Sequence, residues 1–250
     1  MFTKVKTPAE IENIRKSGRI LAEILQGVRE VAKPGATGLD IDAFVGSEAE
    51  GVNAICAFKN YEGFPGNICI STNDEVVHGI PNDRPFEKGD VVTFDFGINY
   101  GGMITDAAFT MVIGEQPTGD KKRLIEGTEA ALYRGLEEID AGDHIGDISA
   151  AIGDALNGAG LGIVRELVGH GVGHEVHEQP DIPNYGRAGQ GPVLKKHMSL
   201  AIEPITTLGD HKIKVDSDGW TIRTADGSLA AHFEHTVLVL DDGCEILTKL

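Results

Sequence analysis

Three histidines and three acids lie within the fifteen positions of ELVGHGVGHEVHEQP, residues 166–180. His170 and His174 are four apart, which is the spacing by which a helix presents two imidazoles to one zinc ion. Glycines interleave these histidines, however, and each glycine costs a helix about 1 kcal/mol relative to alanine. The zinc motif also requires glutamate at the position that Gly171 occupies. We therefore reject a helical one-metal site and ask which other groups could share a cation with these histidines.

Two aspartates flank a predicted hairpin turn in VVTFDFGINYGGMITDAAFT, residues 91–110. If Tyr100 and Gly101 form the tip, Asp95 and Asp106 stand directly opposite each other, with Cβ atoms roughly 5 Å apart. Like charges at that distance repel, and strand interiors disfavour aspartate in any case. A cation between the two carboxylates would remove the conflict. For the hairpin alone, the alternative that one aspartate faces solvent or caps the turn remains open.

Two glutamates interrupt apolar runs in the second half of the chain, Glu203 in LAIEPI and Glu234 in AAHFEHTVLVL. A lone carboxylate in such a run is expensive to bury unless it is paired or binds a metal. With the two aspartates, these glutamates carry four negative charges, which two divalent cations would neutralise. Four carboxylates and one imidazole form a coherent ligand set for a two-metal centre, in which the ions activate a bridging water and polarise a carbonyl. Such an oxygen-rich set favours manganese or iron(II), while cobalt and zinc are also compatible.

The segments that must position these groups alternate in type along the chain. Thr7, Pro8 and Glu10 have the spacing of a helix start with a reciprocal cap, and apolar residues then recur at helical spacing until the KPG stretch at 33–35. Apolar and alternating runs indicate strands in the middle and at the end of the chain. The predicted order is a helix to about residue 32, a helix at 39–51, strands at 66–113, helices at 121–138 and 145–156, and strands from about 163 onward.

This order suggests a duplicated unit, and three short matches support it. GATGLDIDA resembles GDHIGDISA, which relates Asp40 to Asp147 at an offset of 107. VVTFDFGI resembles LAIEPI, which relates Asp95 to Glu203 at an offset of 108. VHGIP and VHEQP share Val-His-x-x-Pro at an offset of 99, so a length change must separate the halves. Each match is short, and coincidence remains the alternative.

The composition is that of an ordinary globular protein: 250 residues, of which 41% are hydrophobic and 24% charged. The formal net charge of −17 disfavours nucleic acid as a substrate, because such binding needs cations that neutralise phosphates. No apolar run approaches the roughly 20 residues that span a bilayer, and the start of the chain lacks a secretory pattern. Three irregularly spaced cysteines argue against a disulfide framework. We therefore expect a cytoplasmic protein that binds neither nucleic acid nor membrane.

Six motifs follow one another between about residues 4 and 248: VVHGIP, TFDFG…TDAAFT, ELVGHGVG…VHEQP, AIEPI, DGWTI and FEHTVLV. As a set they resemble methionine aminopeptidase of type I, the bacterial kind. The resemblance implies an α+β class, pita-bread fold, in which two pseudo-symmetric α/β halves surround a central antiparallel β-sheet. It also implies a single catalytic peptidase domain over residues 1–250, with an internal duplication into halves of roughly 1–115 and 116–250.

The resemblance further implies two divalent metal cations, with Co, Mn, Fe(II) and Zn as candidates. Their expected ligands are Asp95, Asp106, His170, Glu203 and Glu234. In the family's pattern, Asp106 and Glu234 bridge the two ions. Asp95 lies mainly on one ion, and His170 completes the shell of the other. Glu203 is additionally expected to handle the proton of the attacking water.

Two further histidines, His78 and His177, match the family's substrate-facing positions. The resemblance implies that His78 contacts the scissile amide and that His177 steadies the charge on the carbonyl oxygen. His170 and His177 would point to opposite faces of a regular strand. We therefore expect the glycines to bend the chain and bring both rings into one cleft. His174 matches no family motif, and we expect it to face solvent or to support neighbouring groups.

The resemblance also implies a pocket for the methionine side chain of the substrate, beside His78 and His177. Its expected lining is Tyr61, Phe64, Cys69 and Trp220. An unbranched thioether suits a partly aromatic cavity, since sulfur–aromatic contacts add to burial. Two structural alternatives remain open: Trp220 could cover a turn, and Cys69 could be a small core residue.

The implied function is removal of the initiator methionine from nascent proteins, with a preference for a small second residue. The expected partners are nascent polypeptide N-termini and, transiently, the ribosome, and the expected state is a monomer. One alternative is a Pro-directed dipeptidase or aminopeptidase of the same fold. Such enzymes usually carry an additional N-terminal domain, for which we expect no room before the first helix. The other alternative is a non-catalytic peptide-binding protein of this fold, but such proteins have lost the metal ligands.

Overall fold

The computed structural model describes residues 2–249 of the chain. Its helices are α1 (Pro8–Val31), α2 (Gly38–Gly51), α3 (Gly119–Leu136) and α4 (Ile145–Gly158), with one 3-10 turn, η1 (Tyr61–Gly63). Its strands are β1 (Ile55–Cys56), β2 (Cys69–Thr72), β3 (Glu75–Val77), β4 (Val91–Tyr100), β5 (Met103–Val112), β6 (Gly162–Ile163), β7 (Gly169–Gly171), β8 (Glu178–Ile182), β9 (Ser199–Ile202), β10 (Ile205–Thr207), β11 (Ile213–Val215), β12 (Ile222–Thr224), β13 (Ala230–His232), β14 (Glu234–Val239) and β15 (Cys244–Ile246). Met1 and Leu250, the ends of the predicted domain, lie outside the described residues.

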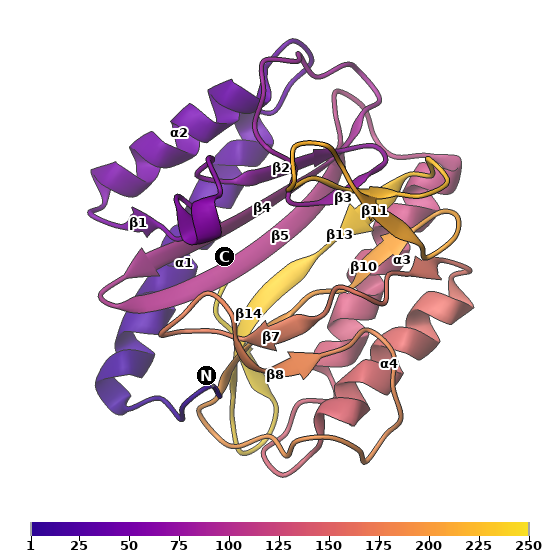
Figure 1. Ribbon diagram of the computed structural model, residues 1–250. Helices are drawn as coiled ribbons and strands as arrows, with labels where there is room; N and C mark the ends of the chain where they lie inside the picture. Colours follow the sequence, from indigo (N-terminus) through magenta and orange to yellow (C-terminus); the bar gives the residue numbers. More distant parts are fainter. Residues whose placement is uncertain (1, 250) are drawn as a thin grey trace.

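A nine-stranded sheet forms the centre of the molecule, with the path β1-β4-β5-β14-β9-β7-β8 and with β2 and β15 paired beside it. Its strand pairs are antiparallel. Two smaller sheets have the orders β13-β10-β6 and β11-β12-β3. Figure 1 shows α1 and α3 passing behind the strands, so the front of the sheet faces loops and short strands. The predicted mixed architecture around a central antiparallel sheet is confirmed.

The local sequence explains where the helices begin and end. At the start of α1, Glu10 Oε2 accepts a hydrogen bond of 2.7 Å from the Thr7 backbone N–H, and the Thr7 hydroxyl accepts one of 3.4 Å from Glu10 N–H. This is the predicted reciprocal cap, with Pro8 in the first helical position. The four predicted helices agree with the observed boundaries to within two residues. Within residues 2–249, no helix combines the length and apolar character needed to cross a membrane.

Strand β4 divides its side chains between the core and the front of the sheet. Phe94, Phe96 and Ile98 are 0% exposed and pack in the same core cluster as the apolar face of α1. Asp95 lies between them and lines a pocket on the other side. Because successive strand residues point to opposite faces, the apolar alternation of β4 delivers Asp95 to the front of the sheet.

The β4–β5 hairpin differs from its predicted register. Its tip is Gly101–Gly102, with φ values of 60° and 80°. A type I′ turn requires positive φ at both tip residues, and glycine adopts positive φ more readily than Tyr100, which the prediction had placed at the tip. Asp95 therefore pairs with Ala108, and Asp106 pairs with Gly97. The prediction that Asp95 and Asp106 stand directly opposite each other was wrong by two positions. Because that shift is even, the two aspartates still share one face, as diagonal neighbours.

Helices α2 and α4 begin in similar ways. The carboxylate of Asp40 accepts a hydrogen bond of 2.8 Å from the Thr37 backbone N–H, and Asp147 accepts one of 2.8 Å from His144 N–H. Both capping residues also form isolated antiparallel bridges, Thr37 with Pro85 and His144 with Val193. The two helix starts are thus built alike at positions 107 residues apart.

Candidate metal centre

All eleven residues predicted for the site line one pocket of about 180 Å³. The pocket opens on the front of the sheet. Its four carboxylates of the predicted set and His170 come from β4, β5, β7 and β14 and from the connection between β9 and β10. Segments that are far apart in the sequence therefore meet at one place.

Three side chains from neighbouring strands converge most closely. Asp106, His170 and Glu234 each offer one potential ligand atom, and these atoms lie within 4.8 Å of one another. Glu234 begins β14, which pairs with β5 on one side and with β9 on the other. The pairing of β7 with β9 brings His170 opposite Ala201. The antiparallel strand order therefore places two carboxylates and one imidazole within reach of a single cation.

Burial dominates the electrostatics of the four carboxylates. It raises the pKa of Asp106 to about 7, and it raises the pKa values of Asp95, Glu203 and Glu234 well above their usual range, where the neighbouring acids add to the effect. Among residues 2–249, no hydrogen-bond partner lies near Asp95 Oδ1, Asp106 Oδ1 or Glu234 Oε1. Buried carboxylates without partners are costly unless they are protonated or bind cations. These residues therefore fit a centre of divalent cations.

His170 is held as a neutral imidazole. Its Nδ1 donates a hydrogen bond of 2.8 Å to the Gly171 carbonyl, which leaves Nε2 free and 3.5 Å from Glu203 Oε1. Burial lowers the pKa of His170 to about 3. The flanking glycines are required by close backbone contact, because a Cβ at Gly169 would lie 2.5 Å from the Ala201 carbonyl oxygen. The local sequence thus presents an unprotonated imidazole nitrogen to the carboxylates.

The two predicted substrate-facing histidines lie at the edge of this cluster. The rings of His170 and His177 are 4.4 Å apart between centroids, so the predicted bend that brings both into one cleft is confirmed. His177 Nδ1 lies 3.1 Å from the Tyr61 hydroxyl. Burial lowers the pKa of His78 to about 4 and also lowers that of His177. Both rings are therefore neutral near pH 7, and each has an N–H that can donate.

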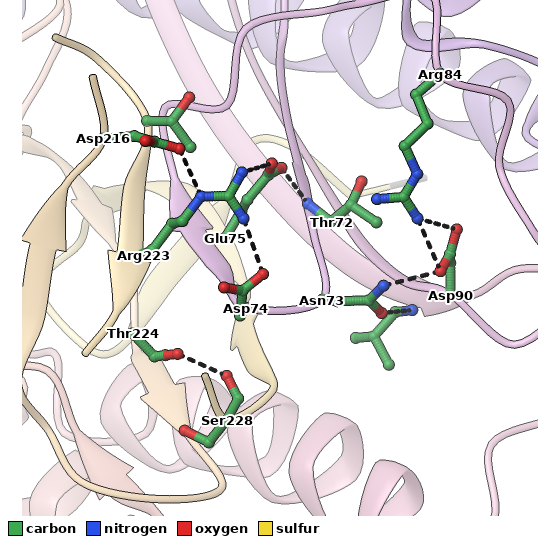
Figure 2. Close-up of polar contacts among 12 residues, drawn as sticks. Thr72, Asn73, Asp74, Glu75, Arg84, Asp90, Asp216, Arg223, Thr224 and Ser228 are labelled. Carbon is green, nitrogen blue, oxygen red and sulfur yellow. Dashed lines mark hydrogen bonds and ion pairs between the residues drawn. The ribbon is translucent and has the colours of Figure 1, made fainter. Parts of the chain in front are cut away.

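His78 has an unusual backbone, with φ of 60°, directly after β3. Strand β3 is tied to the β11–β12 hairpin by the guanidinium of Arg223. Figure 2 shows this group between three acids, with distances of 2.9, 2.7 and 2.7 Å to Asp74, Glu75 and Asp216. Trp220 lies on the turn of that hairpin. The ion-pair network therefore joins the segment that carries His78 to the segment that carries Trp220.

An apolar recess adjoins the polar cluster. Phe64 and Trp220 meet edge to face with ring centroids 5.3 Å apart, and Tyr61 packs against the same group. Cys69 is 5% exposed and pairs across the sheet with Asp95. The alternatives that Trp220 covers a turn and that Cys69 is a small core residue are compatible with this arrangement. Asp218 shapes the turn before Trp220, since its carboxylate accepts a hydrogen bond of 2.8 Å from the Trp220 backbone N–H. The four residues nevertheless lie together beside the carboxylates.

The sequence analysis missed His232. Its ring is 2% exposed, and its Nε2 lies 3.5 Å from Glu203 Oε2 and 3.7 Å from Glu234 Oε2. Neither ring nitrogen has a hydrogen-bond partner within the described part of the chain. The sequence AAHFEH could have indicated its position. His232 is two residues before Glu234, and residues two apart share one face of an extended segment.

His174 lies apart from the pocket, as expected. Its Nε2 is 2.8 Å from Glu10 Oε1, and its side chain is 27% exposed. Its Nδ1 is 3.6 Å from Glu178 Oε1. This histidine therefore joins the start of α1 to the segment that carries His177.

Comparisons with known proteins agree with this geometry. A family model described as metallopeptidase family M24 matches residues 12–241. Methionine aminopeptidase of Clostridium acetobutylicum is 44% identical over 245 residues, which cover 98% of this chain and 98% of that protein. The crystal structure of methionine aminopeptidase from Thermotoga maritima matches with a TM-score of 0.97 and 43% identity, covering 100% of both chains. Prolidase from Pyrococcus furiosus is more distant, with a TM-score of 0.77, 25% identity and 65% of its length covered. The predicted pita-bread fold and the resemblance to bacterial methionine aminopeptidases are thus confirmed, and the chain belongs to metallopeptidase family M24.

Proposed function

We propose that this chain is a metal-dependent aminopeptidase that removes the N-terminal methionine from nascent proteins. The observation that carries the proposal is the position of an apolar, aromatic recess directly beside a buried cluster of carboxylates and one neutral imidazole. A recess of that kind accepts an unbranched thioether. The relatives that match nearly the whole chain bear the name of this activity.

Five residues would hold the metal centre: Asp95, Asp106, His170, Glu203 and Glu234. Asp95, Asp106 and Glu234 each have one buried oxygen without a hydrogen-bond partner among residues 2–249, and His170 has a free Nε2; both observations support this assignment. The close approach of Asp106, His170 and Glu234 to one another also supports their place in this set. When bound, two divalent cations supply an activated water and polarise the carbonyl of the scissile bond. The donor set is compatible with Co, Mn, Fe(II) or Zn.

Glu203 would move the proton in this reaction. In the metal-free protein, burial raises its pKa, and the charges of Asp95 and Asp106 add to that rise. Glu203 would take the proton of the attacking water on a carboxylate oxygen and return it to the nitrogen of the leaving amine. Its oxygens lie 3.5 Å from His170 and 3.5 Å from His232, so it occupies the centre of the polar cluster.

His78 and His177 would stabilise the reacting amide. Both are neutral near pH 7, because burial lowers their pKa values. His177 would donate from Nε2 to the carbonyl oxygen as negative charge builds there, while the Tyr61 hydroxyl orients its Nδ1. His78 would contact the amide nitrogen. The His177 ring is held by Tyr61 before the substrate arrives, which reduces the reorganisation needed in the transition state.

Substrate choice would follow from the recess and from the space beyond the scissile bond. Phe64, Trp220, Cys69 and Tyr61 would surround the methionine side chain. We expect a small second residue to be preferred. The turnover of Met-Ala-Ser should therefore exceed that of Met-Leu-Ser, measured as kcat/KM.

The whole chain would act as one catalytic domain with an internal duplication, in halves of roughly 1–115 and 116–250. The matching helix starts at Thr37 and His144, and the matching bridges that each of them forms, support this history. The ligands would then come from both halves, with Asp95 and Asp106 from the first half and the remainder from the second.

The expected setting is the cytoplasm, where a monomer meets nascent chains and touches the ribosome transiently. The formal charge of −17 disfavours a lasting contact with ribosomal RNA. Sedimentation of ribosomes with the protein at 50 and 200 mM salt tests this. Binding that survives 200 mM salt would contradict a transient contact.

The deciding experiment is hydrolysis of Met-Ala-Ser by protein stripped with EDTA and then supplied separately with Mn²⁺, Co²⁺, Fe²⁺ or Zn²⁺. Asp106→Asn should abolish the activity, whereas the exposed acid-to-amide change Asp154→Asn on α4 should leave it unchanged. A Pro-directed enzyme would instead cleave Xaa-Pro dipeptides in preference to Met-Ala-Ser. A protein that bound no metal and cleaved nothing under all four conditions would be a non-catalytic binding protein.

A further inference from the structure

The segment that carries His177 has little regular structure of its own. Residues 172–177 lie between β7 and β8 and belong to neither a helix nor a strand. The His177 ring nevertheless has a defined place, 4.4 Å from the His170 ring and within 3.1 Å of the Tyr61 hydroxyl. Other contacts must therefore hold the backbone from which this ring projects.

The carboxylate of Glu178, the residue directly after His177, supplies those contacts. Its Oε1 accepts hydrogen bonds of 2.7 Å from His174 N–H and 3.0 Å from Glu175 N–H, so one oxygen closes the bend. Glu178 is 3% exposed, and its Oε2 has no hydrogen-bond partner among residues 2–249. A buried carboxylate of this kind is strongly destabilising unless a positive charge lies nearby.

Lys6 provides that positive charge from the N-terminal segment. Its Nζ lies 3.8 Å from Glu178 Oε2, and the two side chains are 0% and 1% exposed. The ammonium also donates hydrogen bonds of 2.9 Å to Thr3 Oγ1 and 2.9 Å to the Lys4 carbonyl. Burial lowers the pKa of Lys6, and the charges of Glu178 and Glu10 oppose that effect. Lys6 and Glu178 therefore form a buried ion pair in which each charge depends on the other.

Two glycines make room for this arrangement. A Cβ at Gly173 would lie 2.6 Å from Lys6 Cε and 2.9 Å from Lys6 Nζ. A Cβ at Gly171 would lie 2.8 Å from Thr3 Cβ. Gly173 also has a φ of 141°, which residues with a Cβ rarely adopt. The N-terminal segment thus fills the space under the bend that aims His177 into the pocket.

We infer that Lys6 and Glu178 are a positioning pair that sets the orientation of the His177 ring. This inference rests on the proposed function, in which His177 donates to the carbonyl oxygen of the scissile bond. Neither Lys6 nor Glu178 is among the described residues that line the pocket, so the pair acts through the backbone of the bend and not on the substrate. If Lys6 loses its charge, Glu178 gains a proton or water and loosens its two backbone hydrogen bonds. A shift of about 1 Å at a catalytic donor can lower a rate about a hundredfold.

The kinetic test uses substitutions that preserve side-chain size. Lys6→Met should lower kcat for Met-Ala-Ser about tenfold to a hundredfold, with KM changed less than about threefold. Glu178→Gln retains the oxygen that accepts from the backbone and should act in the same direction. The double variant has neither buried charge and should recover most of kcat. Lys4→Met is the matched control, because Lys4 is exposed in the same segment, and it should leave kcat unchanged.

The second arm separates positioning from a general effect on folding. In a His177→Ala background, Lys6→Met should cause no further loss of kcat, because the ring that it positions is already gone. Equal losses in both backgrounds would overturn the inference. If Lys6→Met does not fold, Glu178→Gln takes its place in this cycle, and equal losses of kcat with and without the His177 ring would be equally contrary.

A measurement independent of activity completes the test. In protein labelled with ¹⁵N-histidine and loaded with diamagnetic Zn²⁺, Lys6→Met should shift or broaden the His177 ring signals and leave those of His235 in place. Unchanged His177 signals would overturn the inference whatever the kinetics. Failure of the wild type to cleave Met-Ala-Ser would refute the proposed function alone, since the spectra would still decide whether Lys6 orients His177.

Discussion

Asp106→Asn should stabilise the metal-free protein while it destroys the activity. Burial raises the pKa of Asp106 to about 7, against an ordinary value of 3.8. A raised folded-state pKa means that the contribution of this carboxyl to stability is fully present below pH 3.8 and is lost as the pH rises through 7. The difference of about three pKa units corresponds to about 4 kcal/mol, because each unit is worth about 1.36 kcal/mol. Asp106 is 3% exposed, so little of this cost is screened by solvent.

The assay is urea unfolding of EDTA-treated wild type and Asp106→Asn at pH 5 and pH 8. The variant should gain up to about 4 kcal/mol over the wild type at pH 8 and less at pH 5. Saturating Mn²⁺ should reverse the order at pH 8, because binding to the folded state stabilises only the protein that retains its ligands. Asp154→Asn, on the exposed side of α4, is the control and should change little. A metal-free Asp106→Asn protein that is no more stable than the wild type at pH 8 would show that the carboxylate cluster is not strained.

Three further predictions concern the helix cap and the substrate pocket. Thr7→Ala should cost about 1 kcal/mol of unfolding free energy in calorimetry, whereas Thr118→Ala should cost much less, because among residues 2–249 the Thr118 side chain makes no capping hydrogen bond. Trp220→Ala should raise KM for Met-Ala-Ser far more than it lowers kcat, since it removes one wall of the recess, and an unchanged KM would place the methionine elsewhere. His78→Ala should lower kcat about a hundredfold with little change in KM, as expected for a donor used in the transition state; a variant with normal kcat would exclude His78 from the reaction.

Much of the fold could be predicted because its signals are local. The helix start at Thr7 depends on residues three apart, and the strand β4 depends on the alternation of Phe94, Asp95 and Phe96. The hairpin register was predicted two positions away from the observed one, because the tip depends on which two residues accept positive φ. Turns at neighbouring positions of the hairpin differ only slightly in energy. The periodicity of the flanking strands does not reveal the position of the tip, since a shift of two residues preserves the faces.

The residues that support the site were harder to predict than those proposed to act in it. Asp106 and Glu234 could be predicted as site residues, because a carboxylate in an apolar run is costly to bury unless it is paired or binds a metal. His232 has no such conflict with its neighbours, and its importance appears only when Glu203 is seen 3.5 Å away. Lys6 lies in a polar segment that reads as exposed surface, yet it is 2% exposed, because a glycine at 173 leaves space for it. Contacts between distant segments of this kind have no local pattern.

Strand β14 pairs with both β5 and β9, although it is synthesised after both of them. While the protein is being translated, β5 and β9 are complete before residue 234 is added, so each has an open edge that can pair with a foreign strand. Strand β14 closes both edges at once and brings Glu234 to the pocket in the same event. Pairing across such a long sequence separation is slow compared with local folding. We therefore expect the exposure of these two strand edges and the absence of Glu234 from the pocket to end in the same step, when β14 docks.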